Sequence, residues 1–134
     1  MLVDANILID ALEDEPIWSD WAIAQLKEQS FRHQLFVNSI IYAEVSLAYP
    51  TPEELDDALN TLGITLLEIP RQAAFLAGRA FAEYRKSGGT KTNVLSDFFI
   101  GAHAQVTGMP ILTRDVRRYR RYFSDVVLVS PSVQ

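Results

Sequence analysis

Hydrophobic and polar positions along the chain divide it into short apolar runs and longer segments with helical spacing. The apolar runs of strand length cover residues 2–3, 35–37, 64–69, 111–112 and 126–129. Segments with helical periodicity cover about residues 6–13, 16–30, 40–49, 52–62, 71–86 and 95–107, and a short arginine-rich helix follows Asp115. Because strands alternate with helices, the pattern predicts an α/β fold with a parallel sheet wrapped by helices.

Several residues predict where these elements begin and end. Pro16 suits the first turn of a helix, and Ser39 is a good N-cap for the next one. Gly63 is a natural stop before the strand over residues 64–69, whose almost continuous apolar character is typical of a buried parallel strand. The segment over residues 87–93 is the one clearly flexible stretch, with Gly88 and Gly89 at its centre.

Composition points to one ordinary globular domain over residues 1–134. The chain is 49% hydrophobic and 22% charged, and it contains no internal repeats or linkers. It has no cysteine, which excludes disulfides, zinc–thiolate sites and cysteine nucleophiles. Asp4 falls where a signal peptide needs a positive start, and no apolar run approaches the ~20 residues of a membrane span. We therefore expect a cytoplasmic protein without a membrane segment.

The net charge of −5 hides an asymmetry between the two halves of the chain. Residues 1–70 hold 13 acidic and two basic side chains, which gives −11, whereas residues 71–134 hold ten basic and four acidic ones, which gives +6. Such a split suggests a surface that binds a polyanion on the basic side. The alternative is that the two halves interleave in space, so that the split has no functional meaning.

Four acidic residues stand where a parallel α/β sheet gathers its ligands. Asp4 ends the first strand, and Asp115 follows the fourth strand closely. Glu44 lies in the apolar helix after the second strand, and Asp97 lies in the first turn of an apolar helix. The crevice beyond the carboxyl ends of the strands is the usual binding site in such sheets. We therefore expect the four carboxylates to converge there.

Each acid also has a structural interpretation of its own. Asp97 could complement the dipole of its helix, Asp115 could cap a helix, and Glu44 could pair with an arginine. Only the joint pattern points to chemistry, because four adjacent carboxylates stay ionised only beside a cation. Carboxylate oxygens without thiolates or paired histidines favour Mg²⁺ or Mn²⁺. Asn6 and Thr113 are the polar neighbours expected to orient an acid or the ion's water.

The motifs that contain these acids resemble the PIN domain family, and within it the VapC toxins of bacterial type II toxin–antitoxin pairs. The resemblance is carried by Asp4-Ala5-Asn6, by Glu44 within SIIYAEV, by Asp97 within NVLSDFFIGAHA and by Asp115 within ILTRDVRRYRRYF, and it spans essentially the whole chain. One departure is Ala5, where the family often has a hydroxyl residue.

The resemblance implies a fold and an activity. The implied fold is a three-layer α/β/α sandwich with a central, mostly parallel sheet of four to five short strands. The implied activity is that of a Mg²⁺- or Mn²⁺-dependent endoribonuclease, with Asp4, Glu44, Asp97 and Asp115 as both metal ligands and catalytic residues. The implied partners are an RNA substrate, a second copy of the chain in a homodimer, and a small VapB-type antitoxin.

The basic side of the chain suggests where RNA binds. Five of the nine arginines fall within residues 114–121, with aromatic residues between and after them. Arginine binds phosphate in a bidentate manner, and aromatic rings stack on unpaired bases. The predicted RNA contacts are Arg114, Arg117, Arg118, Arg121 and, in the flexible segment, Lys91. The alternative is a solvated basic helix, or arginines paired with the acidic half.

Two other functions remain open at this point. A Mg²⁺-dependent phosphohydrolase could use Asp4 as a covalent nucleophile, but position 6 is Asn rather than a second Asp, and no lysine stands beside the four acids. A non-catalytic PIN-like module could bind RNA or protein without cutting. The complete set of acids argues against this non-catalytic module.

Overall fold

The computed structural model describes residues 1–91 and 94–131. The strands in this part of the chain are short: β1 (Leu2–Val3), β2 (Leu35–Asn38), β3 (Ile64–Leu67), β4 (Ile111–Leu112) and β5 (Leu128–Val129). The helices are α1 (Ala5–Leu12), α2 (Ser19–Ser30), α3 (Ser39–Ser46), α4 (Pro52–Thr61), α5 (Arg71–Lys86), α6 (Leu95–Thr107) and α7 (Arg117–Tyr122). The predicted alternation of strands and helices is confirmed.

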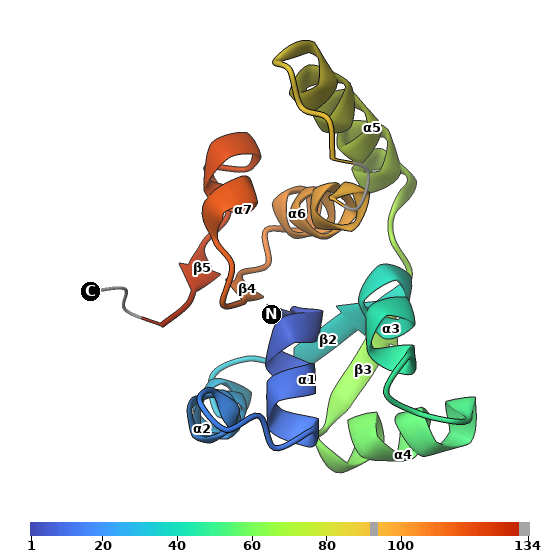
Figure 1. Ribbon diagram of the computed structural model, residues 1–134, viewed down its shortest axis with the longest axis vertical. Helices are drawn as coiled ribbons and strands as arrows, with labels where there is room; N and C mark the ends of the chain where they lie inside the picture. Colours follow the sequence, from blue (N-terminus) through green and yellow to red (C-terminus); the bar gives the residue numbers. More distant parts are fainter. Residues whose placement is uncertain (92–93, 132–134) are drawn as a thin grey trace.

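The five strands form one parallel sheet in the order β3-β2-β1-β4-β5. Because crossovers between parallel strands are right-handed, the helices of the β1–β2–β3 arm cover one face and those that lead to β4 and β5 cover the other. Figure 1 shows α5, α6 and α7 in the upper part of the view and α1, α2 and α4 in the lower part. The expected three-layer α/β/α sandwich is confirmed.

The chain changes direction across the sheet at β1, which has β2 on one side and β4 on the other. Such a switch point leaves a crevice beyond the carboxyl ends of the strands. The central strands that support it are completely buried, because Leu2, Val3, Ile111 and Leu112 have no exposed surface. The residues that follow β1 and β4 are therefore held on a rigid base.

Some predicted boundaries were wrong. The second helix begins at Ser19 rather than Pro16, and the residue that caps α3 is Asn38, whose Oδ1 accepts the Ile41 N–H at 3.0 Å. Asn38 is completely buried, and its amide also contacts Nδ1 of the buried His103 at 3.1 Å. The predicted strand over residues 64–69 ends at Leu67 and lies at the edge of the sheet, and it is not a buried strand because Thr65 and Leu66 are exposed. The predicted flexible segment over residues 87–93 is described only as far as residue 91.

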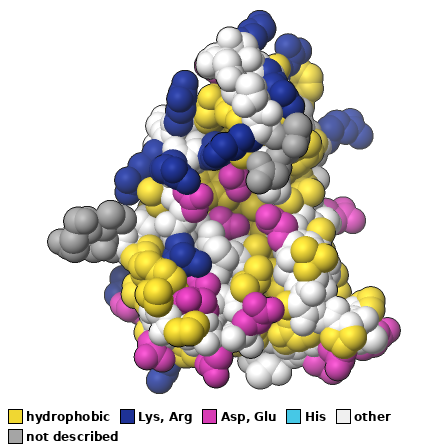
Figure 2. Space-filling model, viewed as in Figure 1, with side chains coloured by type: hydrophobic (Ala, Val, Ile, Leu, Met, Phe, Trp, Pro, Cys, Tyr) yellow, Lys and Arg dark blue, Asp and Glu magenta, His cyan; other side chains and the backbone are white. Residues whose placement is uncertain are grey.

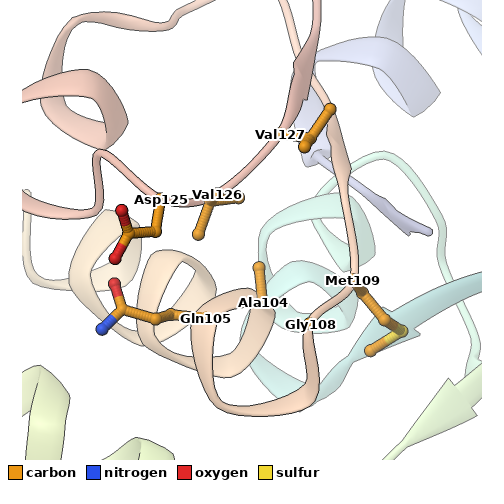
Figure 3. A pocket seen from close by; sticks show the side chains of 7 residues that line it. All are labelled: Ala104, Gln105, Gly108, Met109, Asp125, Val126 and Val127. Atoms are coloured by element: carbon orange, nitrogen blue, oxygen red, sulfur yellow. The ribbon is translucent and has the colours of Figure 1, made fainter.

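A small cavity of about 70 Å³ lies beside the amino ends of β4 and β5, whereas the crevice lies beyond the carboxyl ends of the strands. Figure 3 shows its lining, which is Ala104, Gln105, Gly108, Met109, Asp125, Val126 and Val127. It holds a single acidic side chain and lies away from the strand ends that carry Asp4 and Thr113. Among the described residues, no helix is both long and apolar enough to cross a membrane.

Candidate active site

Asp4 and Thr113 lie side by side because they follow the two neighbouring central strands. Leu2 pairs with Ile111 and Val3 with Leu112, and the Asp4 N–H continues the ladder by donating to the Leu112 carbonyl at 2.9 Å. The next residue on each strand therefore points into the crevice from an adjacent position. The Thr113 hydroxyl donates to Oδ2 of Asp4 at 2.8 Å.

Asp4 is 5% exposed, and hydrogen bonds fix both of its carboxylate oxygens. Oδ1 accepts the Ala5 N–H at 2.8 Å, which caps α1, and Oδ2 accepts the phenol of Tyr119 at 2.9 Å in addition to Thr113. Burial nevertheless raises the pKa of Asp4, and the charge of Asp115 raises it further, while these hydrogen bonds lower it. A cation beside Asp4 would oppose this rise and favour the charged carboxylate.

Asn6 and Thr113 join the start of α1 to the segment after β4. The Asn6 amide donates to the Thr113 hydroxyl at 3.2 Å, and its Oδ1 accepts the Arg114 N–H at 3.1 Å. The Asp115 N–H donates to the same hydroxyl at 3.1 Å. The two residues that the sequence predicts to orient the acids therefore lie between Asp4 and Asp115, within hydrogen-bond distance of each other.

Glu44 comes from α3 and Asp97 from α6, two helices in contact with each other. Burial raises the pKa of Glu44 to about 7, with further contributions from the charges of Asp4 and Asp97. Burial likewise raises the pKa of Asp97 to about 6; the charges of Asp4 and Asp115 add to this and that of Arg118 opposes it. The pKa values of Asp4, Glu44 and Asp97 are therefore raised by burial and by charges within this group of acids, to which Asp115 contributes its charge.

The donor set fits a hard divalent cation. Every candidate ligand is a carboxylate oxygen, and Oε1 of Glu44 is buried without a hydrogen-bond partner among the described residues. Figure 2 shows acidic side chains gathered on this face next to a band of basic ones. In the described part of the chain, however, no three acidic or histidine side chains are placed to hold one metal ion. The charges of the acids act on one another, but the described acids do not form a closed shell of ligands around one ion.

The basic residues predicted to bind RNA divide into two groups. Arg117, Arg118, Arg121 and Lys91 lie around one cleft beside α7, and Nε of Arg118 lies 3.9 Å from Oδ2 of Asp97. Arg114 lies apart from them. Its guanidinium forms a bidentate pair with Asp10 and lies over the ring of Trp18, with 5.0 Å between Cζ and the ring centroid.

The structure adds one residue that the sequence analysis did not single out. Tyr119 is 1% exposed, and its ring lies in the core while its hydroxyl reaches Asp4. In the sequence it stands among arginines, where it looked like one of several aromatic residues available for stacking. Its neighbours on α7 are exposed or half-buried. The tyrosine between two pairs of arginines in RRYRRY is the sequence signal that could have identified it as the buried residue of this helix.

A comparison with protein-family models matches residues 1–124 to the model described as the PIN domain. The chain belongs to the PIN domain family. The family match covers every element that carries the acids, from β1 to α7.

Several solved structures share this fold. VapBC2 from Rickettsia felis, bound to a DNA fragment from its promoter, matches with a TM-score of 0.74 and 18% identity over 98% of each chain. VapBC-1 from nontypeable Haemophilus influenzae matches with a TM-score of 0.71 and 20% identity over 96% of each chain. FitAcB from Neisseria gonorrhoeae matches with a TM-score of 0.65 and 18% identity over 95% of this chain and 94% of the other. A search of the curated proteins finds no matching relative.

Proposed function

We propose that this PIN domain is a metal-dependent endoribonuclease of the VapC type, the toxin of a toxin–antitoxin pair. The observation that carries the proposal is a group of four acids in which burial and neighbouring charges raise the pKa of three. The pKa of Glu44 is raised to about 7 and that of Asp97 to about 6, and the pKa of Asp4 is raised by burial. Such perturbation in a crevice is typical of catalytic sites, and PIN domains are generally nucleases.

Asp4, Glu44, Asp97 and Asp115 would hold Mg²⁺ or Mn²⁺. When bound, such an ion supplies positive charge to the phosphodiester and hydroxide at neutral pH. Thr113 and Tyr119 hold Oδ2 of Asp4, and Ala5 holds Oδ1, so the orientation of this carboxylate is set before any ion arrives. No separate protein base is needed.

RNA would approach from the basic side of the crevice. Arg117, Arg118, Arg121 and Lys91 are proposed to bind its phosphates, because arginine and lysine neutralise the backbone and release counterions. Arg114 remains a weaker candidate, since RNA has to compete with Asp10 for its guanidinium. The expected products carry a 5′-phosphate and a 3′-hydroxyl.

The proposal includes a VapB-type antitoxin as partner, as in the VapBC complexes with the same fold. A groove of about 440 Å³ between α1, α2 and the end of α4 is the candidate surface for it. Ile23 is 48% exposed beside this groove, and Leu12 and Leu62 line it. Other exposed apolar side chains, such as Phe75 on α5, are available for the expected homodimer.

The proposal is tested by incubating purified, partner-free protein with total RNA in Mg²⁺, in Mn²⁺ and in EDTA, and by mapping the ends of the products. We expect discrete cuts that depend on metal and vanish in Asp4→Asn. Asp20→Asn, an exposed acid of α2, is the matched control and should cut normally. Cuts that persist in Asp4→Asn or in EDTA would contradict the proposal. RNA binding without cleavage in any condition would favour the non-catalytic module instead.

A further inference from the structure

A cleft of about 190 Å³ lies between the C-terminal part of α5 and α7, beside the acids. We call it the Tyr84–Tyr122 cleft. Its lining consists of Tyr84, Lys91, Arg117, Arg118, Arg121 and Tyr122. The described lining therefore contains four cationic side chains, two aromatic rings and no carboxylate. This combination suits a ligand that is both anionic and aromatic.

Arg118 joins the cleft to the acidic crevice. Its Nε lies 3.9 Å from Oδ2 of Asp97, and its Cζ lies 5.9 Å from the centroid of the Tyr84 ring. The side chain is 17% exposed, and its Nε has no hydrogen-bond partner in the described part of the chain. A ligand in the cleft would therefore reach directly to the edge of the four acids.

The two aromatic rings are held in place before any ligand binds. Tyr84 packs at 5.6 Å from Phe98 and 6.3 Å from Tyr122, measured between ring centroids, and Tyr122 packs at 5.1 Å from Phe98. The Tyr84 hydroxyl accepts the N–H of Lys91 at 3.1 Å. Gly89 lies against the Tyr84 ring so closely that a Cβ at this position would be 2.4 Å from the ring. A preformed wall loses little conformational entropy when a ligand binds.

We propose that the Tyr84–Tyr122 cleft binds one unpaired nucleotide of single-stranded RNA next to the phosphodiester that is cut. The base would contact the tyrosine rings, and the neighbouring phosphates would contact Arg117 and Arg121. This inference rests on the proposed nuclease function and adds the place where one base of the substrate is held. A duplex could reach the exposed arginines, but its paired bases are stacked and could not reach the rings.

Binding can be measured without cleavage, using wild-type protein in EDTA. The probes are a 12-nucleotide single-stranded RNA of mixed sequence, its blunt duplex, and a series of single strands with 2-aminopurine at one position each. We expect the single strand to bind more tightly than the duplex. We also expect fluorescence quenching at one position, because stacking on an aromatic ring quenches 2-aminopurine.

Variants of α7 separate the cleft from general attraction to a basic surface. Arg121→Gln removes a cleft cation, and Arg120→Gln removes an exposed arginine of the same helix outside the cleft lining. We expect Arg121→Gln to weaken single-strand binding about five- to tenfold and to reduce the salt slope by roughly 0.7. Arg120→Gln should change the affinity less than about twofold.

The rings are tested by Tyr122→Leu, with Tyr122→Phe as the variant that keeps the ring. Loss of base stacking should weaken binding about five- to a hundredfold in Tyr122→Leu and abolish the quenching, while Tyr122→Phe should retain both. Thermal melting checks that each variant is folded. If Tyr122→Leu does not fold, Arg121→Gln against Arg120→Gln decides the question.

Three results would overturn the inference: equal affinity for single strand and duplex, equal effects of Arg120→Gln and Arg121→Gln, or quenching that survives in a folded Tyr122→Leu. The inference and the nuclease function fail in different experiments. Wild-type protein that does not cut RNA in Mg²⁺ would refute the nuclease, whereas normal cutting of single-stranded RNA by folded Tyr122→Leu and Arg121→Gln would refute the cleft alone.

Discussion

The phenol of Tyr119 donates a hydrogen bond of 2.9 Å to Oδ2 of Asp4, a residue 115 positions earlier in the chain. Asp4 belongs to the end of β1, and Tyr119 is the buried residue of the short helix α7. The arginines proposed to bind RNA flank Tyr119 on that helix. One hydrogen bond therefore links the position of the basic helix to the orientation of the central carboxylate.

Tyr119→Phe should impair catalysis more than folding. The ring keeps its packing, while Asp4 loses one of the donors to Oδ2 and its charged form becomes less favourable. We expect Mg²⁺-dependent cleavage or metal affinity to fall about 10–100-fold and the free energy of unfolding to fall by about 1 kcal/mol. Cleavage rates measured across a Mg²⁺ titration give the first quantity, and urea denaturation gives the second.

Tyr42→Phe is the matched control for this variant. The Tyr42 phenol donates to Oδ1 of Asp56 at 2.8 Å, but this pair lies on the surface and includes none of the four acids. The control should leave both the cleavage rate and the Mg²⁺ midpoint unchanged. If the two phenylalanine variants cut RNA equally well, Tyr119 has only a structural role.

The sequence predicted those elements whose boundaries depend on neighbouring residues. The helices over residues 71–86 and 95–107 were predicted with the observed bounds, because Pro70 precedes the first and Gly108, with φ of 71°, ends the second. The alternation of strands and helices predicted a parallel sheet but not the order of its strands, which only the structure gives. Asp4 was predicted at the end of β1 because a buried apolar pair stops there.

The remaining features depend on contacts between distant segments, which local patterns do not contain. The run over residues 64–69 is mostly apolar in sequence, yet its strand lies at the edge of the sheet that the described residues form, beside β2. Arg114 looked like part of a basic RNA-binding run, and only the fold brings Asp10 against it. Tyr119 was missed for the same reason. An effect of the acids on one another's pKa was expected, but only the three-dimensional structure shows it, for Asp4, Glu44 and Asp97.

Without metal, the protein should become less stable as the pH rises from about 4.5 to about 7. The folded pKa of Glu44 is about 7, above the ordinary value of 4.5, so the folded state holds more protons than the unfolded state in this interval. The stabilising effect is therefore complete below the unfolded pKa and is lost as the pH rises through the folded pKa. Asp97, with a pKa of about 6, acts in the same direction. Melting temperatures in EDTA at about pH 5.5 and about pH 8 measure the change.

Glu44→Gln should flatten this pH dependence, since the amide does not titrate. Glu53→Gln, which changes an exposed acid of α4, should leave the dependence as in wild type. Mg²⁺ should raise the melting temperature more at about pH 8 than at about pH 5.5, because protons compete with the ion for the carboxylates. A Glu44→Gln protein with the wild-type pH dependence would refute the assignment.

Arg114→Met should destabilise the protein by about 3 kcal/mol. Asp10 is 2% exposed and would lose the guanidinium that neutralises it, and a buried charge without its partner is strongly unfavourable. This value is at the low end of the expected range because the Arg114 side chain is 30% exposed. Urea denaturation measures the loss.

The double variant Asp10→Leu with Arg114→Met should recover most of that stability, because a pair of apolar side chains removes the unpaired charge. It also decides whether Arg114 contacts RNA. If the folded double variant binds single-stranded RNA as tightly as wild type, Arg114 stabilises the segment before Asp115 and is not an RNA contact. A double variant as unstable as Arg114→Met would show that the pair is not the source of the loss.

Two glycine-to-alanine variants should change stability in opposite directions. Gly101 lies in α6 against the ring of the buried Phe123, and a Cβ there would be 2.3 Å from Cδ2 of that ring. Gly101→Ala should therefore displace the ring that follows α7 and destabilise the protein by about 1–3 kcal/mol. Gly78 lies on the exposed side of α5 with no atom within 4 Å of its Cβ position, so Gly78→Ala should stabilise by about 0.5–1 kcal/mol through helix propensity. Urea denaturation compares the two variants, provided that the free energy of unfolding depends on urea with the same slope in both. Equal urea midpoints would mean that α6 does not fix the position of Phe123.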